Sequence, residues 1–138
     1  MAQALILDAE ALNALAQPAA RGVVAGRASA ILRLAFERRA LIRVPAPVLA
    51  EVCRGVRHVA AVNRLLGNPG VVVAELTRPV AQRAGHLLAR LKLSSAHAVD
   101  AFVVATALQF ETAVIATGDP ADIRRLAAPF RHVGVLAL

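Results

Sequence analysis

The stretch AVIATGDPADIRRL, residues 113–126, contains a complete strand–turn–helix pattern. Its apolar run ends in a Thr-Gly pair, and Asp119 then stands where a helix N-cap is expected, followed by Pro120 at the first helical position. Asp122 falls in the first helical turn, where the helix dipole favours a carboxylate. The pattern predicts a strand followed by a helix. It leaves open whether the two aspartates only start that helix or also form half of an acidic metal site.

The same alternation of strands and helices runs along the whole chain. Short apolar runs predict strands at 5–7, 41–44, 71–74, 113–116 and 132–136. Helical patterns lie between them, at 9–16, 27–39, 47–55, 58–66, 79–91, 95–111 and 120–127, with a loop at residues 17–26. Strands that alternate with helices and read as continuous apolar runs are typical of a parallel sheet covered on both faces. We expect one α/β domain over residues 1–138, with a central, mostly parallel sheet flanked by helices on both faces.

Composition limits the class of protein further. Hydrophobic residues make up 58% of the chain and the mean hydropathy is +0.61, yet no run approaches the 18 or so apolar residues of a membrane-spanning helix. The first residues, MAQALILDAE, lack a basic leader, and Asp8 interrupts their apolar run. The single cysteine, Cys53, excludes an intramolecular disulfide and a cysteine-rich zinc site. We expect a soluble, cytoplasmic protein that does not associate with membranes.

The charge balance is strongly basic. Sixteen basic residues, all but Lys92 arginine, stand against nine acidic ones, which gives a net charge of +7. The guanidinium group suits phosphate because it donates two parallel hydrogen bonds. A GC-rich genome and an acidic partner protein explain the same bias. With four Phe and no Trp or Tyr, a surface that reads sequence through base stacking is not expected.

Two aspartates follow predicted strands directly. Asp8 lies at the carboxyl end of the first strand, and Asp119 lies just past the carboxyl end of the fourth. Ligands of open α/β sheets bind beyond the carboxyl ends of the strands. If these two strands are neighbours, both carboxylates lie in one crevice. Asp8 is equally well explained as the cap of the helix that follows it.

Two further carboxylates occur in apolar helical segments. Asp100 lies in AHAVDAFVVA, and such a helix belongs in the interior, where an ionised carboxylate needs a partner. That partner is either a metal ion, the interpretation we favour, or a basic side chain such as an Arg or His97. Glu51 lies in VLAEVC, and an exposed i,i+3 pair with Arg54 is the alternative to a site role.

Taken together, five of the nine carboxylates fall at strand ends or in such helices: Asp8, Glu51, Asp100, Asp119 and Asp122. Without them, four acids remain against sixteen bases, so the chain would be a basic body around an acidic pocket. A divalent cation relieves the repulsion among clustered carboxylates, and oxygen ligands alone favour Mg²⁺ or Mn²⁺. A metal in such a pocket, approached by a phosphate chain over a cationic surface, suits phosphodiester hydrolysis.

The sequence resembles the PIN-domain nucleases, and within them the VapC-like toxins of bacterial toxin–antitoxin systems. Four segments carry the resemblance, in order: LILD at 5–8, VPAPVLAEV at 44–52, VDAFVVATA at 99–107 and ATGDPADIRRL at 116–126. Any one segment alone is weak, whereas the four in this order and spacing are specific.

The resemblance implies a set of site residues. Asp8, Glu51, Asp100 and Asp119 match the catalytic acidic quartet of the family. It further implies that Asp8, Asp100 and Asp119 ligate the metal, with Asp122 matching a less regular extra acid. Thr117 matches the hydroxyl position of the last motif. The implied activity is that of a Mg²⁺-dependent endoribonuclease toxin, with Mn²⁺ as a substitute ion, which cuts RNA, is held inactive by a cognate antitoxin and forms a homodimer.

One departure concerns Glu10, which replaces the small hydroxyl residue that the family commonly has two positions after its first Asp. Glu10 either adds an outer carboxylate to the site or faces solvent, and we favour solvent. His97 lies one helical turn before Asp100 and either contacts that carboxylate or the substrate, or is structural.

Two other classes of function compete with a nuclease. In the first, a catalytically silent binding module uses the acidic pocket to receive an Arg from a partner protein. In the second, a phosphate-accepting receiver domain uses strand-end aspartates and Mg²⁺. Receivers require a Lys near the end of a late strand, and Lys92 does not lie there.

Overall fold

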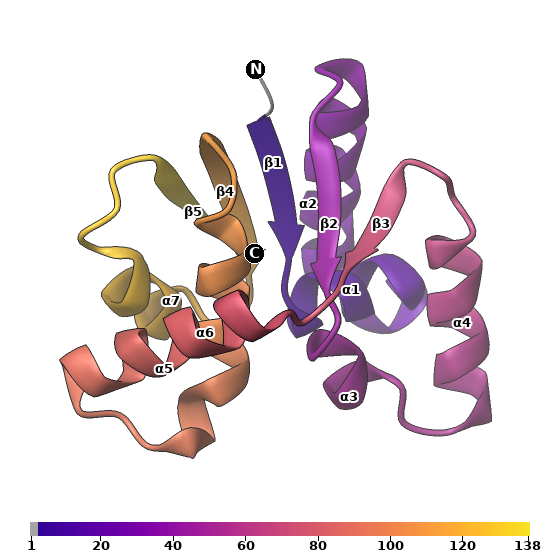
Figure 1. Ribbon diagram of the computed structural model, residues 1–138. Helices are drawn as coiled ribbons and strands as arrows, with labels where there is room; N and C mark the ends of the chain where they lie inside the picture. Colours follow the sequence, from indigo (N-terminus) through magenta and orange to yellow (C-terminus); the bar gives the residue numbers. More distant parts are fainter. Residues whose placement is uncertain (1–2) are drawn as a thin grey trace.

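The computed structural model describes residues 3–138, apart from the side chain of Arg21, and shows a five-stranded sheet (Figure 1). The strands are β1 (Gln3–Leu7), β2 (Leu41–Pro45), β3 (Val71–Ala74), β4 (Thr112–Thr117) and β5 (Val133–Ala137). Their order is β3-β2-β1-β4-β5, and every neighbouring pair is parallel. The α/β prediction is confirmed, and the sheet is wholly parallel rather than mostly so.

Helices cover both faces of this sheet. They are α1 (Ala9–Ala16), α2 (Pro18–Glu37), α3 (Val48–Val52), α4 (Val56–Leu66), α5 (Arg78–Leu91), the 3₁₀ turn η1 (Ser95–His97), α6 (Ala98–Ala107) and α7 (Pro120–Ala127). Figure 1 shows α1 and α2 behind the sheet and α5 and α6 in front of it. No helix within residues 3–138 is both long enough and apolar enough to span a lipid bilayer.

The strand order creates a crevice beside the central strand. The chain begins at β1, adds β2 and β3 on one side, and then returns to place β4 on the other side. Such a reversal separates the loops that follow β1 and β4, and ligands of parallel sheets bind there. In the register of this pair, Leu7 lies opposite Ala116, so Asp8 and Thr117 leave the sheet at the same level.

The core is apolar and continuous through the central strands. Ile6, Ile42 and Ile115 are fully buried on β1, β2 and β4. Helix α6 packs against these three strands and buries six of its ten residues, including Val103 and Val104. The sequence-based expectation that the Asp100 helix lies in the interior is therefore confirmed.

Three expected boundaries were wrong, of which the smallest error is in the helix expected at 47–55, which ends at Val52. The loop expected at residues 17–26 is helical, because Pro18 opens α2 and Gly22 absorbs a kink with φ 52° and ψ −117°. The helix expected to reach residue 111 ends at Ala107, where the Phe110 N–H donates to the Ala107 carbonyl and turns the chain towards β4.

The Gly22 kink provides a matched test of the fold. Gly22→Ala forces a side chain into a backbone region that only glycine adopts readily, which should lower the free energy of unfolding by about 1–3 kcal/mol. Gly26→Ala, in the regular part of the same helix with open space around it, should instead raise it by about 0.5–1 kcal/mol. Urea unfolding of both variants measures the two changes. Equal changes at the two positions would show that α2 is not kinked at Gly22.

Candidate active site

A cavity of about 330 Å³ opens at the carboxyl edge of the sheet, and its lining is dominated by acids. The carboxylates that line it are Asp8, Glu10, Glu51, Asp100 and Asp119. The remaining lining residues are Ala9, Val99, Val103 and Gly118. The structure thus brings together all four acids of the predicted quartet, which come from the ends of β1 and β4 and from helices α3 and α6.

Asp8 is fixed by both loops that meet in the crevice. Its side chain is buried, with 6% of its surface exposed. One carboxylate oxygen accepts a hydrogen bond from the Ala11 N–H at 2.9 Å and so caps α1, while the other accepts from the Gly118 N–H at 3.2 Å. The Asp8 side chain therefore caps α1 and lines the cavity at the same time. Burial raises the pKa of Asp8, and hydrogen bonds from Ala11, Thr117 and Gly118 oppose that rise.

Thr117 organises the turn that carries Asp119. Its side chain is fully buried, and its hydroxyl oxygen accepts from the Asp119 N–H at 2.9 Å. The same hydroxyl hydrogen-bonds to the carboxylate of Asp8. The Thr117 hydroxyl thus contacts both the carboxylate of Asp8 and the backbone of Asp119.

Asp119 stands at the N-cap position of α7, but its side chain makes no capping hydrogen bond. The expectation that this carboxylate caps the helix is therefore wrong. The Asp119 N–H itself donates to the Thr117 hydroxyl, which holds the turn before α7. That side chain is exposed and lines the cavity.

Glu10 and Gly118 are packed against each other. A Cβ atom at position 118 would lie 2.3 Å from Cγ of Glu10, closer than atoms can approach. Glu10 is half-buried and lines the cavity, so the expectation that it faces solvent is wrong. The requirement for glycine at position 118 was missed from the sequence. The Gly that directly follows a strand-ending Thr was the available signal.

Asp100 is surrounded by like charge. It is half-buried on α6, and its pKa is raised to about 6 by burial and then by the charges of four carboxylates: Asp119, Asp122, Asp8 and Glu51. The alternative expectation of an ion pair with Arg is not met, since no ion pair to Asp100 joins residues described in the structure. Nothing in the cavity lining neutralises this carboxylate.

Glu51 is exposed on α3 and reaches the mouth of the cavity. The alternative to a site role for Glu51 was an exposed i,i+3 ion pair with Arg54. Instead, Nε of Arg54 donates to the carbonyl of Ala50 at 3.0 Å. The Glu51 carboxylate is therefore positioned towards the other acids rather than in a helical ion pair.

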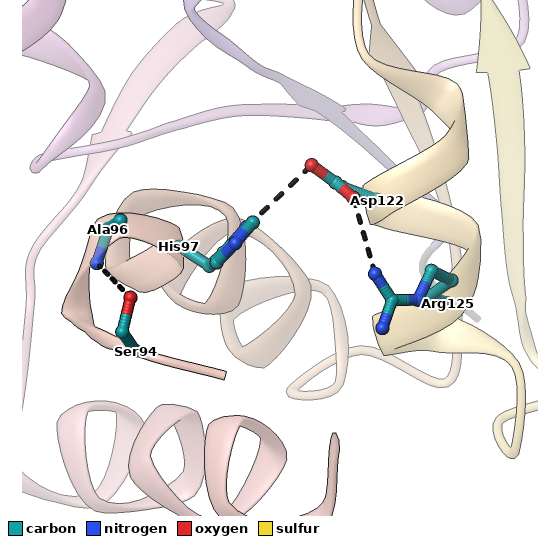
Figure 2. A network of polar contacts seen from close by, with 5 residues as sticks. All are labelled: Ser94, Ala96, His97, Asp122 and Arg125. Atoms are coloured by element: carbon teal, nitrogen blue, oxygen red, sulfur yellow. Dashed lines mark hydrogen bonds and ion pairs between the residues drawn. The ribbon is translucent and has the colours of Figure 1, made fainter. Parts of the chain in front are cut away.

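Asp122 and His97 are not among the residues that line the cavity, and Figure 2 shows them facing each other. Nδ1 of His97 is 3.7 Å from one Asp122 oxygen, and a terminal nitrogen of Arg125 is 3.7 Å from the other. One ligand atom each of His97, Asp100 and Asp122 lies within 4.8 Å of the other two. Asp122 thus approaches Asp100 from the side of α7. His97, Asp100 and Asp122 form a second group of possible metal ligands, which is joined to the cavity through Asp100.

The donor set fits a divalent cation. Five carboxylates face one small cavity, no basic side chain lines it, and burial with mutual repulsion raises the pKa of Asp100. A bound cation offsets such repulsion, and carboxylate oxygens are the ligands that Mg²⁺ and Mn²⁺ prefer. The chemistry of the lining therefore supports the expected metal site.

The raised pKa of Asp100 predicts a stability change with pH. The folded state holds this proton more tightly than the unfolded state, whose pKa is near 3.8. The stability that Asp100 contributes is thus full below pH 3.8 and is lost as the pH rises to about 6. With chelator present, the free energy of unfolding of wild type should fall relative to that of Asp100→Asn as the pH rises from 3.8 to about 6. Above about pH 6, the difference between the two proteins should stay constant. Urea unfolding at several pH values tests this, and a pH-independent difference would contradict it.

The comparisons with known proteins agree with the arrangement. The family model of the PIN domain matches residues 5–129, a span that contains the acids of the cavity and their supporting residues. No curated protein and no solved structure matches the chain significantly. PIN domains are generally nucleases, and the all-parallel sheet with acids at its carboxyl edge is in accord with that chemistry. With most of its length matched by this model, the chain belongs to the PIN-domain family.

Proposed function

We propose that this protein is a Mg²⁺-dependent endoribonuclease that hydrolyses RNA phosphodiester bonds at the acidic cavity. The observation that carries the proposal is the convergence of five carboxylates on one cavity in a chain with a net charge of +7. A phosphate chain cannot approach such a cavity closely unless a cation screens the carboxylates. A metal ion that binds both the acids and the phosphate meets this requirement.

Asp8, Asp100 and Asp119 are the acids that would hold the ion, with Asp122 as a supporting ligand. When bound, the divalent cation would polarise a phosphoryl oxygen and lower the pKa of water. Thr117 and Gly118 hold Asp8 through its carboxylate oxygens, so the position of this ligand is set before substrate arrives. We assign the proton-accepting role to Glu51, because its carboxylate lines the same cavity and is exposed to solvent.

The basic side chains supply the attraction for the substrate. Between residues that the structure describes, the only ion pairs join Asp122 to His97 and to Arg125. Most arginines whose side chains the structure describes are therefore without a carboxylate partner, which leaves the surface of the protein positively charged. Such a surface raises the rate at which a polyanion is captured and makes its binding depend on salt.

The choice of RNA, the toxin role and the partners rest on the four segments that resemble VapC-like toxins. On this basis the protein is a cytoplasmic toxin that forms a homodimer and is neutralised by a cognate antitoxin. The basic surface also fits an acidic segment of such an antitoxin. Mn²⁺ is expected to replace Mg²⁺, since the donors are oxygens.

The purified chain should cleave single-stranded RNA when Mg²⁺ is added and stop when chelator is added. Asp100→Asn should lower the rate by more than about 100-fold, because even outer partners of a metal ligand contribute about 10- to 100-fold. Glu75→Gln, an exposed carboxyl outside the cavity lining, is the matched control and should cleave like wild type.

Gel analysis of the fragments over time measures both rates. Cleavage that survives Asp100→Asn would place the chemistry elsewhere. Wild-type protein that binds a partner through the cavity but never cleaves RNA would support a silent binding module instead.

A further inference from the structure

A second cavity, of about 350 Å³, lies between helix α7, the loop after it and strand β5. Arg124, Phe130 and Arg131 line it together with a small apolar floor of Ala127, Ala128, Val133 and Val135. No carboxylate lines this cavity, in contrast to the acidic cavity at the carboxyl edge of the sheet. Its chemistry therefore favours an anionic group with an apolar part.

The charged side chains that line this cavity are both basic. Residues 123–138 contain three arginines and one histidine but no acid. Of the three arginines, Arg125 forms an ion pair with Asp122, with 3.7 Å between a terminal nitrogen and a carboxylate oxygen. Arg124 and Arg131 are exposed, and neither forms an ion pair with any residue that the structure describes. Two guanidinium groups thus flank one cavity with their hydrogen-bond donors unused by carboxylates.

The aromatic wall of the cavity is held in place by its neighbours. Phe130 is half-buried, and the guanidinium of Arg83 lies 5.6 Å from the centre of its ring. The ring of His132 meets it edge-on, at 6.4 Å between centroids and 82° between planes. These contacts hold the ring and bring one further cation, the Arg83 guanidinium, to the neighbourhood of the cavity.

The loop that carries Phe130 is tied to the fold by its backbone. The Phe130 N–H donates to the Ala127 carbonyl at 2.9 Å, and the Val133 N–H donates to the Phe130 carbonyl at 3.1 Å. The His132 carbonyl accepts from the Ala113 N–H at 2.9 Å. The cavity is therefore preformed, which lowers the entropic cost of binding there.

We propose that this cavity binds one nucleotide of a single-stranded RNA outside the bond that is cleaved, with the base against Phe130 and the flanking phosphates on Arg124 and Arg131. Helix α7 begins beside Asp119 and ends beside the second cavity, and eight residues of helix span about 12 Å. An RNA strand along α7 thus reaches both cavities. Stacking on one Phe tolerates any base, so the site increases affinity rather than reading sequence. The inference rests on the proposed function, since it assigns part of the same substrate.

The test measures RNA binding without catalysis. Fluorescence anisotropy in chelator follows a labelled oligouridylate long enough to span both cavities, at several salt concentrations. The double variant Arg124→Gln/Arg131→Gln should bind more weakly and lower the salt slope by about 1.4, or about 0.7 for each lost single-strand phosphate contact. Phe130→Leu should weaken binding about ten-fold while keeping an apolar side chain in the wall. Urea unfolding of each variant confirms that the fold is intact.

The matched control is Arg27→Gln/Arg33→Gln, which removes two exposed arginines from α2 on the other face of the sheet. Its salt slope should stay close to that of wild type. Two results would overturn the nucleotide site. In the first, both double variants lower the salt slope of RNA binding equally. In the second, Arg124→Gln/Arg131→Gln keeps its RNA binding and loses only the binding of an acidic peptide such as polyglutamate. Wild type that neither binds nor cleaves RNA overturns the proposed function as well, so the two failures are distinguishable.

Discussion

Five carboxylates converge on one cavity beside β1 and β4, and their repulsion is the constraint on which the rest of the site depends. The fold sustains this arrangement because Asp8 also caps α1 and accepts from the loop after β4. Asp100 receives no comparable support, and burial with four neighbouring charges raises its pKa to about 6. The metal-free site thus lowers the stability of the fold at neutral pH, and a divalent cation would relieve that cost.

The strand positions, and the places of Asp8 and Asp119 at strand ends, were predictable because continuous apolar runs end directly at Asp8 and before Asp119. In a parallel sheet with these strands adjacent, the two acids must meet. Asp100 was predictable from a different physical conflict, a single carboxylate in an apolar helix. These inferences used the pattern of apolar residues alone, whereas Glu51 joined the set only through the resemblance to the PIN-domain nucleases, and the adjacency of the two strands came from the structure.

Other features depend on packing that sequence patterns do not show. Asp119 occupies the N-cap position that the pattern predicts, yet its side chain makes no capping hydrogen bond and lines the cavity instead. Glu10 faces the cavity because the loop after β4 packs against it at Gly118. Gly22 was expected in a loop, but it lies at a kink between two helical segments of α2. In each case a contact between distant segments, or a backbone torsion, decided the outcome.

The most direct test of a metal site built on repulsion is thermal unfolding with and without Mn²⁺ near pH 7. Wild type should gain about 2.7 kcal/mol of stability when the ion is present at 100 times its dissociation constant. Asp100→Asn should be more stable than wild type in chelator and gain little from Mn²⁺, because one substitution removes both the repulsion and a ligand. An Asp100→Asn variant that is less stable in chelator, or that gains as much from Mn²⁺ as wild type, would contradict the account.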